Sequence, residues 1–420
     1  MKIAFVEDNF VLWQRGGSFQ ASGVSQKFML TEWESTMDLY ASELQKLGHE
    51  CVKYVPSLEA GPVERLEHAL GYTVVKVPCF SGAYASLAKL DWRVGAIPFT
   101  KRIGREDFVK NADIVHYQSY YSSFFLASTL LGRDVERTAQ YTGGSILQEK
   151  SFLRREVGIL LLRRALKGIG AVMLDDADPE SMGQIEFLTK VARLPSERML
   201  SLPTLMIDPD VFKPRDKRES RRRLGMDDQA IQVMLISAVM EEQPSRGIDL
   251  TKNPFRAVRL FSKIKISPGP DIQLHVVGGG AGLPALKDLV RSLNLEHAVS
   301  FHGVLKHDEV ASYIAASDLV FVPYNFIELN YGTSVIEAFA CGRAACGFRR
   351  LPSAPVDRTG GFLVNPKEES GAIELAIRLR DSVYLERKGS EGIELAKPHF
   401  AASIGKKLES AFSSIRGASR

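Results

Sequence analysis

Residues 319–347 read LVFVPYNFIELNYGTSVIEAFACGRAACG, which contains a strand, a loop, a helix and a second strand in succession. The first run, Leu319–Pro323, is apolar and stops at a proline, and Ala344–Gly347 is another short apolar run. A helix is predicted to begin between them, near Gly332. Strand, helix and strand in this order form the repeating unit of a parallel sheet that helices cover on both faces.

The same alternation extends through both halves of the chain. Strands are predicted at Lys2–Val6, Cys51–Val55, Ile114–Tyr117, Ala171–Leu174, Gln232–Ser237 and Gln273–Val277, and helices at Thr31–Leu47, Asn253–Lys265 and Pro284–Leu293. In the second half, a glycine or a proline marks the turn after each strand. The loops therefore gather at the carboxyl ends of the strands, which is where open α/β sheets bind ligands.

Chain length and one proline-rich segment predict two domains. A chain of 420 residues is too long for one ordinary core. Leu202–Arg223 contains three prolines, which stop both helices and central strands, so this segment is the predicted hinge. We expect a Rossmann-like acceptor domain at 1–205, a Rossmann-like nucleotide-sugar domain at 206–395, and a C-terminal helix at 396–420 that crosses back to the first domain.

Composition indicates a cytoplasmic protein that binds neither nucleic acid nor a structural metal. The 54 Lys and Arg residues exceed the 50 Asp and Glu residues by only four, and no nucleic-acid-binding motif is present. None of the four cysteines forms a CxxC pair, which favours reduced thiols. The N-terminus enters a strand directly, without the charged and apolar regions of a signal peptide, and no apolar run is long enough to span a bilayer.

The segment from Gly332 to Glu337 is the predicted nucleotide-diphosphate site. A helix that begins after Gly332 presents the free backbone N–H groups of its first turn, at Thr333 and Ser334, to a phosphate. Glycine at this point lets the diphosphate approach the backbone. Glu337 follows Thr333 by one turn and lies on the same helix face, where its carboxylate can accept hydrogen bonds from two ribose hydroxyls. Taken alone, Glu337 is better explained as an acid that stabilises its own helix dipole, because the Gly-x-x-x-x-Glu spacing is common.

These residues resemble the donor-site motif of the family 4 retaining glycosyltransferases, whose usual form is E-x-F-G-x-x-x-x-E-A-x-A-x-G. Other landmarks of that family follow in the family's order, at Met206–Pro214, Arg221–Gly225, Arg246–Asp249, Leu274–Gly280, Val299–Gly303, Asp318–Pro323 and Gly360–Pro366. The resemblance covers nearly the whole C-terminal half and is looser in the N-terminal half. It implies the GT-B fold, an α/β architecture in which two Rossmann-like, doubly wound domains face each other across a cleft.

The resemblance also implies a reaction. A hexosyl group would pass from a nucleoside-diphosphate sugar to a hydroxyl acceptor with retained stereochemistry, with no metal and no cofactor other than the donor. The acceptor would be a glycan, a lipid-linked molecule or a small molecule, and the leaving phosphate oxygen would take its proton. Arg246, the N–H groups of Gly332–Ser334, and Gly16 and Gly17 of the first domain would stabilise the charge that grows on the diphosphate.

Two departures from the family pattern concern the sugar end of this site. Leu329 occupies the place of the family's first motif glutamate, with Glu328 beside it. The family's phosphate-binding Gly-Arg pair falls near Ala238-Val239, which leaves Arg246 as the cation that would bind a phosphate, and arginine does so bidentately. We retain Glu328 and Arg246 as candidate catalytic groups.

His116 is the third candidate catalytic group. It lies where the family has an H-x-H pair at the end of a first-domain strand, although the second histidine is replaced by Gln118. A lone histidine at a strand end is also commonly a structural residue with satisfied hydrogen bonds. We expect His116 to face the cleft if it acts on the sugar or the acceptor.

Two alternative functions stay open at this point. The protein could be a nucleotide-sugar epimerase or hydrolase on the same fold, or a partner subunit that binds a nucleotide or glycan without turnover.

The basic and apolar segment Phe152–Lys167 also has two interpretations. It is either a membrane-surface helix or a helix that buries Val157, Leu160 and Leu161 against the first sheet. The second interpretation is favoured because amphipathic helices mostly face a core. The oligomeric state, the nucleotide base, the donor sugar and the acceptor do not follow from the sequence.

Overall fold

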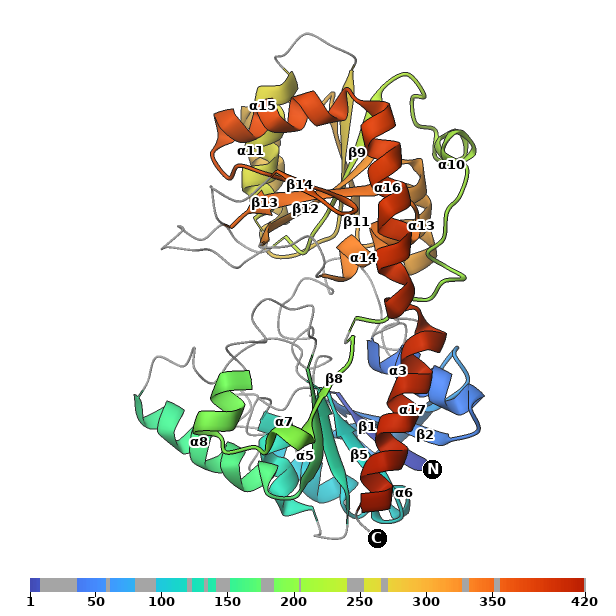
Figure 1. Cartoon of the computed structure of the whole chain (residues 1–420), viewed down its shortest axis with the longest axis vertical. Helices are drawn as coiled ribbons and strands as arrows, with labels where there is room; N and C mark the ends of the chain where they lie inside the picture. The colour runs from blue at the N-terminus through green and yellow to red at the C-terminus, as the bar shows by residue number, and fades with distance from the viewer. Residues whose placement is uncertain are drawn as a thin grey trace. The chain divides into compact units, whose positions relative to one another are not determined.

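The protein forms two compact units (Figure 1). The computed structural model describes residues 1–7, 36–57, 61–79, 96–118, 123–131, 135–140, 152–174, 185–203, 205–239, 253–265, 271–326, 332–350 and 356–418. The first unit contains the described residues up to Met206 together with the last helix, α17 (Ala401–Ala418). The second unit contains the described residues from Ile207 to Phe400.

A sheet of eight strands forms the centre of the first unit. Its strands are β1 (Lys2–Val6), β2 (Glu50–Ser57), β3 (Glu64–Glu67), β4 (Thr73–Pro78), β5 (Ile114–Tyr117), β6 (Arg137–Gln140), β7 (Ile169–Leu174) and β8 (Met199–Ser201). They lie in the order β3-β4-β2-β1-β5-β6-β7-β8, and every neighbouring pair is parallel except β3 and β4. The strand order therefore reverses between β1 and β5, as in a doubly wound fold.

Helices cover both faces of this first sheet. They are α3 (Thr36–Lys46), α5 (Ala96–Ile103), α6 (Asp107–Lys110), α7 (Ser123–Ala127), α8 (Phe152–Leu166) and α17, with short turns η3 (Ser128–Leu130), η5 (Phe187–Val191) and η6 (Ser196–Arg198). Buried residues of α5, α7 and α8 pack with Val115 and Tyr117 of β5. Because side chains alternate along a strand, His116 points to the opposite face, where its ring meets Tyr40 of α3 and Phe412 of α17.

The side chains that α8 buries are not the ones expected. Ile159 and Leu162 pack into the core, whereas Val157, Leu160 and Leu161 are exposed. The predicted burial of those three residues is therefore wrong. Apolar residues occupy two stripes of this helix at helical spacing, and periodicity alone does not decide which stripe faces the sheet.

A sheet of seven strands forms the centre of the second unit. Its strands are β9 (Ile231–Ile236), β10 (Ile272–Val277), β11 (Val299–Gly303), β12 (Leu319–Phe326), β13 (Ala344–Arg349), β14 (Asp357–Arg358) and β15 (Gly361–Val364). They lie in the order β11-β10-β9-β12-β13-β15-β14, and only the pair β14 and β15 is antiparallel. The order reverses between β9 and β12.

The helices of the second unit pack in two layers. They are α10 (Lys217–Leu224), α11 (Pro254–Lys265), α12 (Leu283–Ser292), α13 (His307–Ala316), α14 (Thr333–Ala340), α15 (Glu368–Leu379) and α16 (Ser382–Ala396), followed by η7 (Lys397–His399). Helix α11 packs with α12 and α15, and α14 packs with α13 and α16 (Figure 1). The predicted α/β class, with two doubly wound sheets, is confirmed. Within the described part of the chain, no helix has the length and apolar character needed to cross a membrane.

Candidate functional site

Helix α14 begins at the point of the second sheet where the strand order reverses. Its N-cap is Gly332, with φ 104° and ψ 130°, a conformation that side chains strongly disfavour. The N–H groups of Val335 and Ile336 both donate to the Gly332 carbonyl, at 2.9 and 3.2 Å. Those of Thr333 and Ser334 precede these first bonds of the helix and point out of its N-terminal end. The start of α14 thus combines main-chain donors with the positive end of the helix dipole.

Glu337 lies one turn into the same helix and is almost completely buried, with 6% of its surface exposed. Burial, followed by the charge of the Glu337 carboxylate, raises the pKa of the neighbouring Cys341 thiol to about 12. The Cys341 thiol therefore stays protonated at neutral pH. Glu337 is the one acidic side chain within α14. The structure thus places four predicted binding residues, Gly332, Thr333, Ser334 and Glu337, within the first one and a half turns of α14.

Glycines that follow β10 bring the end of this strand close to the chain that leaves β9. Gly278 and Gly280 follow β10 with φ 133° and 150° and lie against the end of β9. A Cβ atom on Gly278 would stand 1.9 Å from the main-chain carbonyl oxygen of Ser237. One on Gly280 would stand 2.1 Å from the main-chain carbonyl oxygen of Val239. Val239 N–H donates to the Gly279 carbonyl at 2.9 Å. The sequence marks this turn by its run of three glycines. In the structure, these glycines let the ends of β9 and β10 lie against each other with no side chain between them.

Four predicted site residues lie outside the described residues. These are Gly16, Gly17, Arg246 and Glu328, and Leu329 is also among the residues that are not described. After β9, the described chain continues to Val239 and resumes at Asn253, before α11. Arg246 therefore belongs to the segment of sequence between β9 and α11. Their proposed roles stay predictions.

His116 is a buried residue of the first unit. Its side chain is 0% exposed, and its Nδ1 lies 2.8 Å from the Thr138 hydroxyl. Three aromatic rings contact it, those of Phe5, Tyr40 and Phe412. Burial lowers the pKa of His116 to about 3, so the imidazole is neutral at pH 7. This environment supports a packing role, and a part for His116 in the chemistry stays a prediction.

A buried charge cluster that sequence reasoning missed joins the residue after β1, the middle of β2 and the first turn of α3. Lys53 Nζ lies 2.5 Å from Glu7 Oε2 and 2.5 Å from Asp38 Oδ1, and the Tyr72 hydroxyl donates to the same Asp38 oxygen. Burial alone would raise the pKa of Asp38, but the charge of Lys53 lowers it below the usual value. The two carboxylates in turn raise the pKa of Lys53 against the effect of its burial. Asp38 and Lys53 are therefore both ionised at neutral pH.

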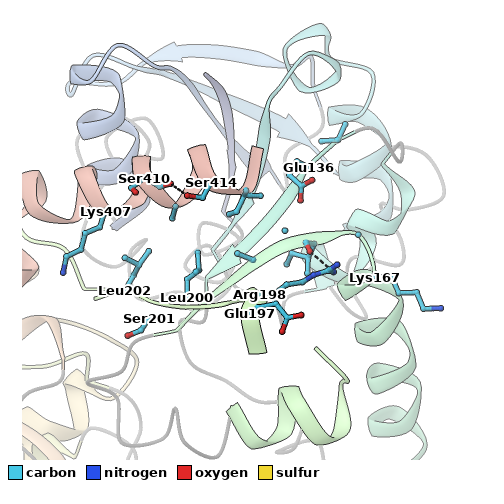
Figure 2. A pocket seen from close by; sticks show the side chains of 17 residues that line it. Glu136, Lys167, Glu197, Arg198, Leu200, Ser201, Leu202, Lys407, Ser410 and Ser414 are labelled. Atoms are coloured by element: carbon cyan, nitrogen blue, oxygen red, sulfur yellow. Dashed lines mark hydrogen bonds between the residues drawn. The ribbon is translucent and has the colours of Figure 1, made fainter. Parts of the chain in front are cut away.

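A separate groove of about 890 Å³ lies on the first unit, between α17 and the strands β7 and β8 (Figure 2). Glu136, Arg198, Ser410 and Ser414 are among its polar side chains. Arg198 Nη1 donates to the Ile169 carbonyl at 3.3 Å, and the Ser414 hydroxyl donates to the Ser410 carbonyl at 3.0 Å. None of the predicted site residues lines this groove. Among the described residues, no three His, Cys, Asp or Glu side chains gather closely enough to hold a metal ion.

Residues 246–378 match the family model described as "Glycosyl transferases group 1". The second unit is similar to the glycosyl transferases of group 1. This match includes β12, α14 and the predicted site residues of that helix. The D-inositol 3-phosphate glycosyltransferase of Stackebrandtia nassauensis is 33% identical over 172 residues, which are 39% of this chain and 37% of that protein. The protein of the same name from Mycobacterium tuberculosis is 31% identical over 183 residues, which are 41% of this chain and 35% of that protein. The matches thus span little more than a third of these relatives' own length.

Solved structures share the fold over nearly the whole chain. Sucrose-phosphate synthase from Thermosynechococcus elongatus superposes with a TM-score of 0.73 at 16% identity, over 99% of both chains. HepE of Anabaena, solved in complex with UDP, superposes with a TM-score of 0.65 at 14% identity, over 99% of this chain and 100% of that chain. The GT-B fold and the resemblance to glycosyltransferases predicted from the sequence are therefore confirmed.

Proposed function

We propose that the protein is a retaining glycosyltransferase that moves a hexosyl group from a nucleoside-diphosphate sugar to a hydroxyl acceptor. The observation that carries this proposal is the start of α14. There, main-chain N–H groups after Gly332 and the buried carboxylate of Glu337 lie together at the point where the strand order reverses. This arrangement suits the two ends of a nucleoside diphosphate, because the N–H groups bind phosphate and the carboxylate binds ribose hydroxyls.

The proposed mechanism uses the protein to position groups and to stabilise charge. As the bond between the sugar and the diphosphate breaks, negative charge grows on the leaving phosphate. The N–H groups of Thr333 and Ser334, the dipole of α14 and the Arg246 guanidinium stabilise that charge. The leaving phosphate oxygen accepts the proton of the acceptor hydroxyl, which attacks the same face of the sugar. The proposal assigns no metal to these steps, and it places the reaction in the cytoplasm.

The relatives suggest which substrates to test first. HepE of Anabaena has been solved with UDP and with UDP-glucose, which favours UDP-sugars among the donors. The relatives named D-inositol 3-phosphate glycosyltransferase suggest a phosphorylated polyol among the acceptors. Leu329 and the missing Gly-Arg pair motivate one alternative, a non-catalytic subunit that binds a nucleotide or glycan. The other alternative, a nucleotide-sugar epimerase or hydrolase on the same fold, would need an acid and a base of the first domain near the anomeric carbon.

A substrate panel tests the proposal. The full chain is incubated with nucleotide sugars, with and without acceptors, while free nucleotide and the anomeric configuration of the product are followed by nuclear magnetic resonance. We expect nucleotide release that depends on the acceptor, with a retained anomeric configuration. Isomerised sugar would indicate an epimerase, release without acceptor a hydrolase, and binding without turnover a binding subunit.

Nucleotide binding tests the site itself. We expect Glu337→Gln to weaken nucleotide binding roughly 10- to 100-fold, because a hydrogen bond to a charged group contributes about 1.5–3 kcal/mol. Glu296→Gln, at an exposed position of the same unit, is the matched control and should bind normally. Calorimetric titration with the nucleotide that the panel identifies measures both. Normal binding by the Glu337 variant would refute the assignment of this site.

A further inference from the structure

Helix α8 of the first unit has an apolar stripe that packs against the sheet and a second apolar stripe that is exposed. The inner stripe includes Ile159, which is 8% exposed, and Leu162, which is 0% exposed. The outer stripe consists of Val157, Leu160 and Leu161, with exposed fractions of 48%, 66% and 40%. Single exposed leucines are common on soluble proteins, but three on adjacent turns of one helix form a patch that calls for an explanation.

Basic side chains continue this outer face toward the end of the helix. Arg164 lies one turn after Leu160 and Leu161, and Lys167 lies one turn after Arg164, and both are exposed. Over residues 155–167 the sequence has four cationic side chains and one acidic one, and the acid, Glu156, pairs with Arg155 at 3.6 Å. The outer face of α8 is therefore apolar in its middle turns and positively charged in its last turn and at Lys167, which follows the helix. That combination is typical of helices that lie in the headgroup layer of a membrane.

We propose that the outer face of α8 docks the protein onto a bilayer that contains anionic phospholipids. Val157, Leu160 and Leu161 enter the boundary between headgroups and acyl chains, and Arg164 and Lys167 contact the lipid phosphates. The side-chain types favour lipid over a protein partner, because protein interfaces are enriched in aromatic residues and depleted in lysine, whereas this face has aliphatic residues and ends at the exposed Lys167. Figure 1 shows α8 along one side of the first unit's sheet, and its three outer apolar side chains are exposed.

The second unit provides a comparison that sharpens this assignment. Helix α15 also exposes apolar residues, because Ile373 and Ile377 are 63% and 60% exposed. Its flanks are acidic, since residues 368–379 contain three glutamates and one arginine. An anionic bilayer would repel those flanks, so α15 matches α8 in apolar exposure and differs from it in charge.

Vesicle sedimentation of the full chain tests the proposal. The vesicles contain either phosphatidylcholine alone or phosphatidylcholine with phosphatidylglycerol at a ratio of 7:3. We expect binding to the anionic vesicles, weaker binding at high salt, and little binding to the neutral ones. Leu160→Asp should weaken binding roughly tenfold or more, because it places a charge in the apolar stripe. Arg164→Glu changes the charge of this face by two units, and each unit should weaken vesicle binding roughly fivefold.

Two matched variants control for unspecific effects. Ile373→Asp replaces an equally exposed apolar residue on α15, and Arg222→Glu replaces an exposed arginine on α10, whose side chain is 77% exposed. Both should bind vesicles as the unchanged protein does. All four variants should melt at nearly the same temperature, since the substituted side chains are exposed.

Three outcomes would overturn the proposal. They are equal binding by Leu160→Asp and the unchanged protein, equal binding to neutral and anionic vesicles, and a self-association that Leu160→Asp abolishes while vesicle binding is absent. The last outcome would assign the outer face of α8 to a contact between copies of the chain. Sedimentation needs no turnover, so its result is independent of the proposed glycosyl transfer.

Discussion

The two units share a doubly wound strand order but differ in what lies beside their central strands, glycines in one and buried charges in the other. In the second unit, the ends of β9 and β10 meet through main chain, at Gly278 and Gly280. In the first unit, buried ion pairs of Lys53 with Glu7 and Asp38 join the end of β1 and the middle of β2 to α3, in addition to the main-chain bonds between the two strands. One edge depends on the absence of side chains, and the other adds buried ion pairs to its main-chain bonds.

This difference shows that the same fold can serve two purposes, leaving room for an anionic ligand in one unit and fixing an edge by buried charges in the other. A strand edge made of main chain leaves N–H groups and space for an anionic ligand, which is what a nucleotide diphosphate requires. A strand edge held by buried charges is rigid only while each charge keeps its partner. The second unit should therefore be sensitive to one added carbon atom, and the first unit to one lost charge.

Adding a methyl group at Gly278 should have the largest effect on stability. Gly278→Ala would force a Cβ to within 1.9 Å of the Ser237 oxygen at a φ of 133°, so the ends of β9 and β10 must separate. We expect a loss on the order of 5 kcal/mol in the stability of the second unit, because both strain and lost main-chain bonds contribute. Hydrogen exchange resolved by peptide should show faster exchange in β9 and β10 and unchanged exchange in β1 and β2.

Gly303→Ala is the matched control for this prediction. Gly303 also has a positive φ, 69°, but a Cβ there would meet nothing within 4 Å. It should cost only about 1 kcal/mol, which is the intrinsic cost of that conformation. If the two variants lost equal stability, close packing of the glycine turn would not explain how β9 and β10 are held together.

Removing the charge of Lys53 should have the next largest effect, and it should appear in the first unit. Lys53→Met leaves the buried carboxylates of Glu7 and Asp38 without their cation, and breaking a buried ion pair in this way costs about 3–5 kcal/mol. Because Lys53 holds the pKa of Asp38 low, its loss should raise that pKa. The variant should then regain part of its stability as the pH is lowered toward 5, which chemical denaturation at several pH values measures.

The compensated triple variant Lys53→Met, Glu7→Gln, Asp38→Asn is the control. It removes all three charges, so it should recover most of the stability that Lys53→Met loses at pH 7. Equal instability of the single and triple variants would show that shape, rather than charge, decides packing at this edge.

The sequence predicts the second unit better than the first, because local patterns determine the second unit's site and distant side-chain partners determine the first unit's buried charges. Around α14, the apolar runs of β12 and β13 and the glycine between them determine the local structure, so the residues from Gly332 to Glu337 could be placed on one helix turn in advance. Strand β6, Arg137–Gln140, has no apolar run and was not predicted. Its buried polar groups depend on partners that are distant in the chain or in another element, such as the bond from Arg137 to the Ser128 hydroxyl. Pattern does not encode such partners.

The same limit explains the residues whose orientation was not predicted. Val157, Leu160 and Leu161 have the spacing of a buried stripe, and only the fold shows that Ile159 and Leu162 face the sheet instead. The charge cluster around Lys53 joins residues from β1, α3 and β2, and no local motif marks it.

A smaller, pH-dependent effect should distinguish the histidines of the two units. Burial lowers the pKa of His116 in the first unit to about 3, and burial, followed by the charges of His302 and Arg221, lowers the pKa of His275 in the second unit to about 4. Both values lie below the value of about 6.5 expected for the unfolded chain. As the pH falls below 6.5, the unfolded chain therefore binds protons that the folded chain does not. Each residue then lowers the free energy of unfolding by about 1.4 kcal/mol per pH unit, until its folded pKa is reached.

Replacing each histidine should remove its part of this pH dependence in its own unit only. His116→Gln should flatten the decline in stability of β1 and β5 between pH 6 and pH 4, and His275→Gln should flatten that of β9 and β10. His297→Gln, at an exposed position, should change neither. Hydrogen exchange in these strands, measured at pH 4, 5 and 6 and corrected for the intrinsic exchange rate, separates the two units. A slope that His116→Gln left unchanged in β5 would mean that His116 takes up its proton in the folded protein, and the packed, neutral role assigned to it here would be wrong.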